Sequence, residues 1–232
     1  MTSVRLATFN CENLFARFKF NKGVDPNKAL KDGWLADKTY FTINDEESKK
    51  LTAKAISETK ADVIALQEVE SLGALRRFRN LYLKGKGYDH IIVLDGNDPR
   101  FIDVAVMSKY PIENVDTHMQ EWNKEINWYT FSRDCLECDI VFPKNKRLRL
   151  FINHFKSMFE KADPCNGRKS SRKKRLIQAK PSEKINPSDP RSAATNMKTG
   201  IAIDIQWKIN GSFFGEYKII GIHGNITTAS LT

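Results

Sequence analysis

The chain has 232 residues, of which 41% are hydrophobic and 10% aromatic, and 38 Lys and Arg against 28 Asp and Glu give it a formal net charge of +10. Such a chain is neither a disulfide-framed miniprotein nor a fibrous protein, and disorder throughout its length is excluded as well. One ordinary domain, or two small ones, fits the length. The positive excess favours a polyanionic or phosphorylated partner, because it concentrates negative ligands around the protein, and it equally favours solubility.

No segment approaches the run of about 18 apolar residues that a membrane span needs, and the first ten residues lead straight into a strand pattern. We therefore expect a soluble, cytoplasmic protein. The four cysteines are Cys11, Cys135, Cys138 and Cys165. Although Cys135 and Cys138 have a spacing found in zinc sites, they fall in a strand pattern over residues 128–142, where positions three apart face opposite sides. Free thiols are the prediction.

Helical and strand patterns alternate in the first half of the chain. Residues 4–9 are predicted to form a buried strand that ends at Asn10, and residues 63–69 a second strand, in which Glu68 arrives as the apolar run ends. Residues 45–60 have the spacing of an amphipathic helix with acidic residues in its first turn, and residues 71–84 that of another. The pattern is that of an α/β protein.

Further strands are predicted at residues 90–94, 102–108, 129–142 and 147–154, with turns between them. The last of these ends on Asn153 and His154. Three predicted strands therefore end on polar side chains, since the first ends at Asn10 and the second at Glu68. One polar residue after a strand is commonly a cap or a turn former. Because sites in layered α/β folds collect where strands end, three such ends predict a shared crevice.

Residues 167–180 form a basic run without an acidic residue, and its seven cations are Arg168, Lys169, Arg172, Lys173, Lys174, Arg175 and Lys180. The run fits either a solvated helix face or a surface that contacts the phosphates of nucleic acid. After Pro181 the composition changes, with 5 Lys and Arg against 4 Asp and Glu. Residues 201–209 and 217–222 read as strands, and the turn at Asn210-Gly211 favours a hairpin.

Four segments, in this order, carry a resemblance to a known family. They are residues 7–15 (ATFNCENLF), 65–70 (ALQEVE), 102–112 (IDVAVMSKYPI) and 151–157 (FINHFKS). Over about residues 3–180 the chain resembles the endonuclease/exonuclease/phosphatase family, the deoxyribonuclease-I-like hydrolases. The resemblance implies a four-layer α/β sandwich, in which two mixed sheets pack face to face with helices outside and the site lies at one edge.

The resemblance also implies roles for single residues. Glu68 matches the carboxylate that binds Mg²⁺, with Mn²⁺ as an alternative, and Asn10 matches the polar residue that helps to hold the metal or its waters. His154 matches the histidine that meets the scissile phosphate. Asp103 and Asn153 match recurrent positions of the site. Lys156 is a candidate phosphate contact, together with the basic run, in particular Arg168, Lys169, Arg172, Lys173, Lys174 and Arg175.

Two motifs of the family's later half are missing from this sequence. These are a Gly-Asp-x-Asn strand end, which positions the attacking water, and a terminal Ser-Asp-His. We therefore divide the chain into a family-like domain at residues 1–180 and a divergent tail at 181–232. The tail is either the result of a truncated or shifted reading, or a natural replacement whose hairpin stands in for the later strands. Either origin predicts an incomplete second half with an unpaired sheet edge, and hence instability or self-association.

The function expected from these observations is metal-dependent hydrolysis of a phosphodiester, most consistent with a nuclease and impaired by the missing motifs. Two alternatives stay open. The chain is an inactive member that binds nucleic acid or phosphate through its basic run, or it is a phosphatase of small phosphoesters, since one fold hosts diverse substrates. The oligomeric state is not indicated by the sequence.

Overall fold

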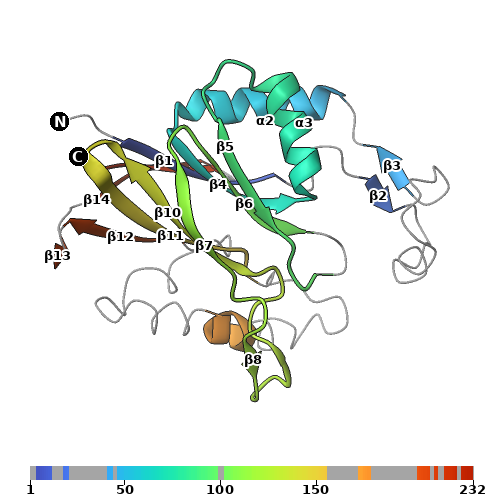
Figure 1. Cartoon of the computed structure of the whole chain (residues 1–232). Helices are drawn as coiled ribbons and strands as arrows, with labels where there is room; N and C mark the ends of the chain where they lie inside the picture. Colours follow the sequence, from blue (N-terminus) through green and yellow to red (C-terminus); the bar gives the residue numbers. More distant parts are fainter. Residues whose placement is uncertain are drawn as a thin grey trace.

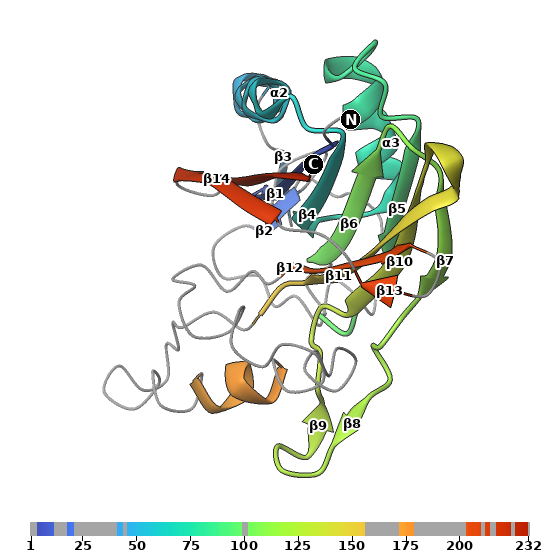
Figure 2. The ribbon, with the colours of Figure 1, turned by 90° about the vertical axis from the view of Figure 1, so that its left-hand side faces the viewer.

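The computed structural model describes residues 4–11, 18–20, 41–43, 46–98, 102–155, 172–178, 203–209, 212–213, 217–223 and 226–231. Within these ranges the chain builds two sheets that pack face to face, with helices on the outer side of the first (Figures 1 and 2).

The first sheet has six strands in the order β14-β15-β1-β4-β6-β5. They are β14 (Tyr217–His223), β15 (Ile226–Leu231), β1 (Val4–Asn10), β4 (Val63–Val69), β6 (Asp103–Ser108) and β5 (His90–Leu94). The strands β1 and β4 run parallel, whereas the other neighbouring pairs are antiparallel. The predicted strands of the first half are thus confirmed, and they lie at the centre of this sheet.

The second sheet has five antiparallel strands in the order β13-β12-β11-β10-β7. They are β13 (Ser212–Phe213), β12 (Ile203–Ile209), β11 (Lys146–Asn153), β10 (Cys135–Phe142) and β7 (Ile112–Asp116). A short 3-10 turn, η1 (Pro143–Asn145), joins β10 to β11. Two small ribbons pair β2 (Phe18–Phe20) with β3 (Phe41–Ile43) and β8 (Trp122–Asn123) with β9 (Trp128–Tyr129).

Two predicted helices cover the outer face of the first sheet. They are α2 (Glu46–Thr59) and α3 (Leu72–Tyr82), and Ser71 caps α3 by accepting a bond from the backbone N–H of Ala74 at 3.2 Å. Their apolar sides pack on one face of β1, β4 and β6 in a core that includes Ile56, Leu75, Phe78, Phe9, Ile64, Leu66 and Met107. Burial of these side chains stabilises the layer, because apolar area leaves water.

A second core lies between the two sheets. It alternates with the first along each strand: Leu66 faces the helices, and Ala65 faces the second sheet. The facing residues of the second sheet include Leu136, Cys138, Ile140, Leu148, Leu150 and Ile152. As predicted, Cys135 and Cys138 belong to different clusters on opposite faces of β10, and both are free thiols, as is Cys11. Cys165 lies outside the described residues.

The predicted strand over residues 129–142 is wrong in one respect. The chain leaves the strand pattern after Tyr129 and re-enters it at Cys135, so that β9 and β10 are separate strands. Asp134 causes the break: its backbone is left-handed, with φ at 67°, and its carboxylate accepts bonds from the backbone N–H groups of His118 and Cys135. The short strands β7 and β8 were not predicted.

The strands of the tail differ from the expected arrangement. Residues 203–209 and 217–223 are strands, but β12 pairs with β11 in the second sheet, whereas β14 pairs with β15 in the first. The hairpin across residues 210 and 211 instead joins β12 to the short β13. Because β15 pairs with β1 and β12 pairs with β11, both β1 and β11 have a partner strand on each side. The expected instability or self-association stays a prediction. The division of the chain at residue 180 stays a prediction.

Candidate active site

Five strand ends meet at one edge of the sandwich. The parallel strands β1 and β4 finish there, with Asn10 in register with Gln67, and the antiparallel β6 begins there, with Asp103 in register with Val69. From the second sheet, β11 finishes at Asn153, which is in register with Cys135 at the start of β10. The predicted shared crevice therefore corresponds to one edge of the fold.

Glu68 is turned toward this edge by a bulge in β4. The register with β6 shifts between Gln67 and Val69, and the backbone of Glu68 is left-handed, with φ at 64°. Gln67 points into the protein, where its Nε2 donates to Oγ1 of Thr8 at 3.1 Å. A left-handed non-glycine residue costs on the order of 1–3 kcal/mol, and bulges of this kind re-aim side chains beside functional sites.

The side chains of Asn10 and His154 both point toward one carboxylate oxygen of Glu68. The Nδ2 of Asn10 donates to Oε1 of Glu68 at 3.2 Å, and Nε2 of His154 lies 3.6 Å from the same oxygen. The side chains of Glu68 and His154 are 18% and 11% exposed, so the cluster is half-buried and reachable from solvent. The structure thus brings together three of the residues singled out in the sequence, from three different strands.

Asp103 and Asn153 lie at the same edge and are both buried. Oδ1 of Asp103 accepts the backbone N–H of Gly96 at 2.8 Å, while Oδ2 of Asp103 and Oδ1 of Asn153 are buried oxygens that have no hydrogen-bond partner among the described residues. Burial, the largest cause, raises the pKa of Asp103 to about 7, against the bond from Gly96, which lowers it. Near neutral pH about half of the Asp103 side chains therefore keep their proton, and in that form the carboxyl can donate a hydrogen bond.

Sequence analysis missed Arg133 and Asp98, which form a buried ion pair at this edge. Nε of Arg133 lies 2.9 Å from Oδ2 of Asp98, and each side chain is 6% exposed. Nη1 of Arg133 also donates to the carbonyl of Phe155, the residue after His154, at 3.5 Å. Neither residue belongs to a periodic pattern. The signal that would identify them is their pairing with each other, and one sequence does not show which charged residues pair.

The donors at the edge fit a hard cation that keeps most of its water. Glu68 offers a carboxylate and Asn10 an amide oxygen, which are ligand types that Mg²⁺ uses when it is held by few protein groups. In the described part of the chain, no group of three or more His, Cys, Asp and Glu side chains is arranged to hold a metal ion. A closed site of the structural zinc type therefore does not occur among those residues, whereas an open site with one carboxylate is compatible with them.

Part of the predicted basic surface is a helix at residues 172–178, on which Arg172, Lys173 and Lys174 are exposed. Arg175 is half-buried, and desolvation lowers the pKa of its guanidinium. Figures 1 and 2 both show this helix at the same end of the molecule as the β8–β9 hairpin. Lys156, Arg168 and Lys169 lie outside the described residues. No described helix is both long and apolar enough to cross a membrane.

No protein-family model and no curated protein matches the sequence. Among solved structures, an endonuclease/exonuclease/phosphatase from Beutenbergia cavernae DSM 12333 is similar over 99% of this chain and 70% of its own, with a TM-score of 0.52 and 12% identity. A humanized TDP2 of D. rerio is similar over 99% of this chain and 97% of its own, with a TM-score of 0.53 and 9% identity. At these identities the likeness shows the fold alone, and it confirms the predicted fold class.

Proposed function

The chain has the fold of endonuclease/exonuclease/phosphatase proteins, and we propose that it hydrolyses phosphodiester bonds with the help of a divalent cation. The observation that carries this proposal is the convergence of Asn10, Glu68 and His154 at one edge of the sandwich. A fold of this kind hosts several activities, so the side chains at the edge, not the likeness, decide the proposal.

Glu68 and Asn10 are the residues that would hold the cation, Mg²⁺ or alternatively Mn²⁺. When bound, such an ion neutralises charge on the phosphate as the pentacoordinate state forms. His154 lies beside Glu68, where its imidazole can orient or protonate a phosphate oxygen. In its protonated form, Asp103 would donate a hydrogen bond to the phosphate, which an ionised carboxylate would repel.

Nucleic acid is the substrate class that the charge supports best. The net charge of +10 attracts a polyanion, and Arg172, Lys173 and Lys174 are exposed cations on the helix at residues 172–178, which lies at the end of the molecule from which the hairpin projects. One observation favours a second candidate, an inactive protein that binds nucleic acid: the sequence has neither Gly-Asp-x-Asn nor Ser-Asp-His. A phosphatase of small phosphoesters shares the same machinery and differs only in substrate.

The test compares Glu68→Gln with the unmodified chain, using plasmid DNA and bis-(p-nitrophenyl) phosphate in Mg²⁺. Glu58→Gln is the matched control, because Glu58 is an exposed carboxylate on α2, far from the strand ends. We expect Glu68→Gln to lose at least about a hundredfold in turnover and His154→Ala about 10²- to 10⁴-fold. Equal turnover in Glu68→Gln would refute the assigned site, and a folded, inactive unmodified chain would favour the binding protein instead.

A further inference from the structure

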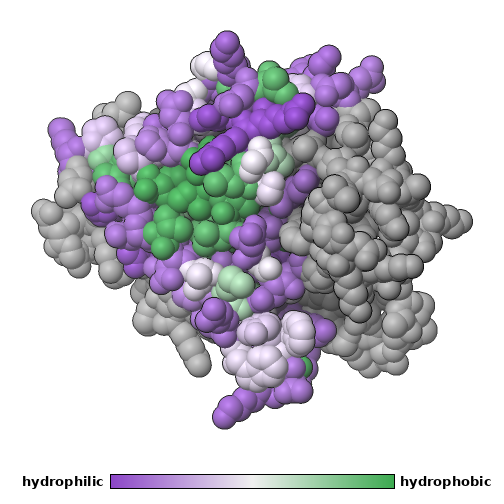
Figure 3. Space-filling view, turned by 45° about the vertical axis from the view of Figure 1, so that its right-hand side comes forward, coloured by the Kyte–Doolittle hydropathy of each residue, from purple (hydrophilic) through white to green (hydrophobic). Residues whose placement is uncertain are grey.

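Three aromatic side chains cluster on the β8–β9 hairpin. Trp122 and Tyr129 meet edge to face, with ring centroids 5.4 Å apart, and Trp128 contacts Tyr129 at 5.6 Å and Trp122 at 6.5 Å. Trp122 and Trp128 are nevertheless 52% and 54% exposed. The hairpin projects from the body of the protein (Figure 2), and in the space-filling view it forms a lobe of intermediate hydropathy at the lower end (Figure 3).

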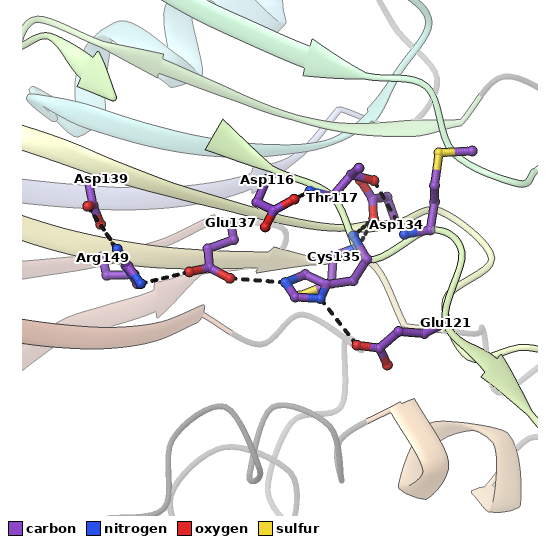
Figure 4. A network of polar contacts seen from close by, with 10 residues as sticks. Asp116, Thr117, Glu121, Asp134, Cys135, Glu137, Asp139 and Arg149 are labelled. Carbon is purple, nitrogen blue, oxygen red and sulfur yellow. Dashed lines mark hydrogen bonds and ion pairs between the residues drawn. The ribbon is translucent and has the colours of Figure 1, made fainter. Parts of the chain in front are cut away.

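The base of this hairpin is held by partly buried polar contacts (Figure 4). The carboxylate of Asp134 accepts Oγ1 of Thr117 and the backbone N–H of His118, both at 2.8 Å. The ring of His118 lies between Glu121 at 3.2 Å and Glu137 at 3.0 Å. The aromatic cluster is thus presented on a fixed support, which lowers the entropy cost of binding a ligand there.

The hairpin rises from the edge that carries the candidate active site. Asp134 directly precedes Cys135, which is in register with Asn153, the residue before His154. Nδ2 of Asn97 bonds the carbonyls of Met119 and Phe131, and Asn97 directly follows Gly96, which donates to Asp103. The base of the hairpin therefore lies at the edge that would hold the phosphate, so that a strand of substrate could extend from His154 toward the aromatic cluster.

Charge indicates which part of a ligand the cluster contacts. Residues 121–129 carry one cation, Lys124, and two anions, Glu121 and Glu125, so that their net charge is 1 − 2 = −1. This surface does not attract phosphates or an anionic membrane, and its exposed rings suit a planar, uncharged group. The phosphates have cations on the helix at residues 172–178, which lies at the same end of the molecule.

We propose that Trp122, Trp128 and Tyr129 form a stacking platform for an unpaired base, and that the substrate is consequently a single-stranded segment of nucleic acid. This inference rests on the proposed function, which supplies the strand at the edge. Bases inside a duplex stack on each other and do not offer their faces to a protein, whereas unpaired bases stack on aromatic side chains without sequence preference. The platform thus selects strand state rather than sequence.

The test measures binding of a fluorescein-labelled oligothymidine, and of a duplex that contains it, by anisotropy in EDTA at low salt. We expect Trp122→Ala and Trp128→Ala each to weaken single-strand binding about fivefold to a hundredfold. Trp128→Phe retains a ring and should stay within about threefold of the unmodified chain. Leu51→Ala is the control, because Leu51 is an exposed apolar residue, 67% exposed, on α2.

Three results would overturn the platform: unchanged single-strand affinity in both Trp variants, equal losses for duplex and single strand, or no measurable binding by the unmodified chain. Trp-dependent binding to phosphatidylserine vesicles, without an effect on oligothymidine, would assign the hairpin to a membrane instead. Because EDTA prevents metal-dependent turnover, the measurement stands apart from hydrolysis. A chain that binds through Trp122 and Trp128 but does not hydrolyse would retain the platform and reject the proposed function.

Discussion

The residues of the candidate site are placed by local features that oppose ordinary strand geometry. Glu68 has a left-handed backbone within β4, and Asp103 is a buried carboxyl with one oxygen that has no partner among the described residues. The sequence allows the choice of Glu68, Asn10 and His154, because each falls where an apolar run stops. It does not predict the bulge that turns Glu68, since a bulge depends on how β4 pairs with β6.

We expect the contribution of Asp103 to the stability of the protein to fall as pH rises from 4 to 7. The folded carboxyl keeps its proton up to about pH 7, whereas the unfolded one releases it near its ordinary pKa of about 3.9. The folded state binds the extra proton, so this contribution is full below pH 4 and is lost through pH 7. Asp103→Asn should gain up to about 4 kcal/mol relative to the unmodified chain over that range.

Urea unfolding in EDTA at pH 4.5, 6 and 8 measures this difference. Asp116→Asn is the control, because Asp116 is an exposed carboxylate that accepts the backbone N–H of Thr117. A difference between Asp103→Asn and the unmodified chain that does not change with pH would contradict the raised pKa of Asp103.

A substitution at Gly96 tests how closely the chain packs beside Asp103. A Cβ on Gly96 would lie 2.7 Å from the carbonyl carbon of Arg133, which is backbone and cannot rotate away. Gly96→Ala should therefore cost about 1–3 kcal/mol of stability by forcing the two loops apart. Gly73→Ala, in helix α3, meets only Oγ of Ser71 at 3.9 Å and should be neutral or stabilising. Equal unfolding midpoints for the two variants would be evidence against this packing.

At the scale of elements, periodicity identifies the strands and helices of the two cores well. The strands β4, β6, β10 and β11 are buried along most of their length, which follows from runs of apolar side chains at neighbouring positions that one sequence displays. The hairpin β8–β9 is not predicted, because its strands have two residues each and are too short to show a periodic pattern, and because its shape depends on contacts at its base. One sequence does not distinguish Trp122 and Trp128 from Trp side chains that are packed in a core, which is the more common position of this residue.

Asp134 is the residue on which the orientation of this hairpin depends most. Asp134→Ala removes acceptors for Thr117, His118 and Cys135, and leaves buried donors without partners. We expect a loss of about 2–4 kcal/mol in unfolding free energy, together with weaker single-strand binding although no aromatic ring is changed. Asp116→Ala, an exposed neighbour, should alter neither quantity. Loss of stability without loss of binding would show that the hairpin keeps its orientation without Asp134.

At the scale of the whole molecule, the four ordered motifs predict the fold, and the structural likeness confirms it. The sequence does not predict with which strands the tail pairs. Its partner strands lie more than 50 residues away in the chain, and they come together only when the sheets assemble. The strands β12 and β15 join different sheets and cover β11 and β1. The tail therefore contributes to the sandwich itself.

This pairing predicts the effect of removing the tail. A chain that stops at residue 180 lacks β12 and β15, so that β11 and β1 become edges with unpaired N–H and C=O groups. We expect the shortened chain to self-associate and the full chain to do so less, as measured by sizing at several concentrations. The same elution volume and unfolding midpoint for both chains would mean that the tail does not complete the sheets.

The most direct measurement of the central claim is the metal dependence of turnover in the unmodified chain. Plasmid DNA and bis-(p-nitrophenyl) phosphate are incubated with protein that was first treated with EDTA and then given increasing Mg²⁺ or Mn²⁺. The account predicts no hydrolysis in EDTA and a saturable return of hydrolysis with either ion, because Glu68 and Asn10 then hold the cation beside His154. Hydrolysis that persists at full rate in EDTA would contradict it.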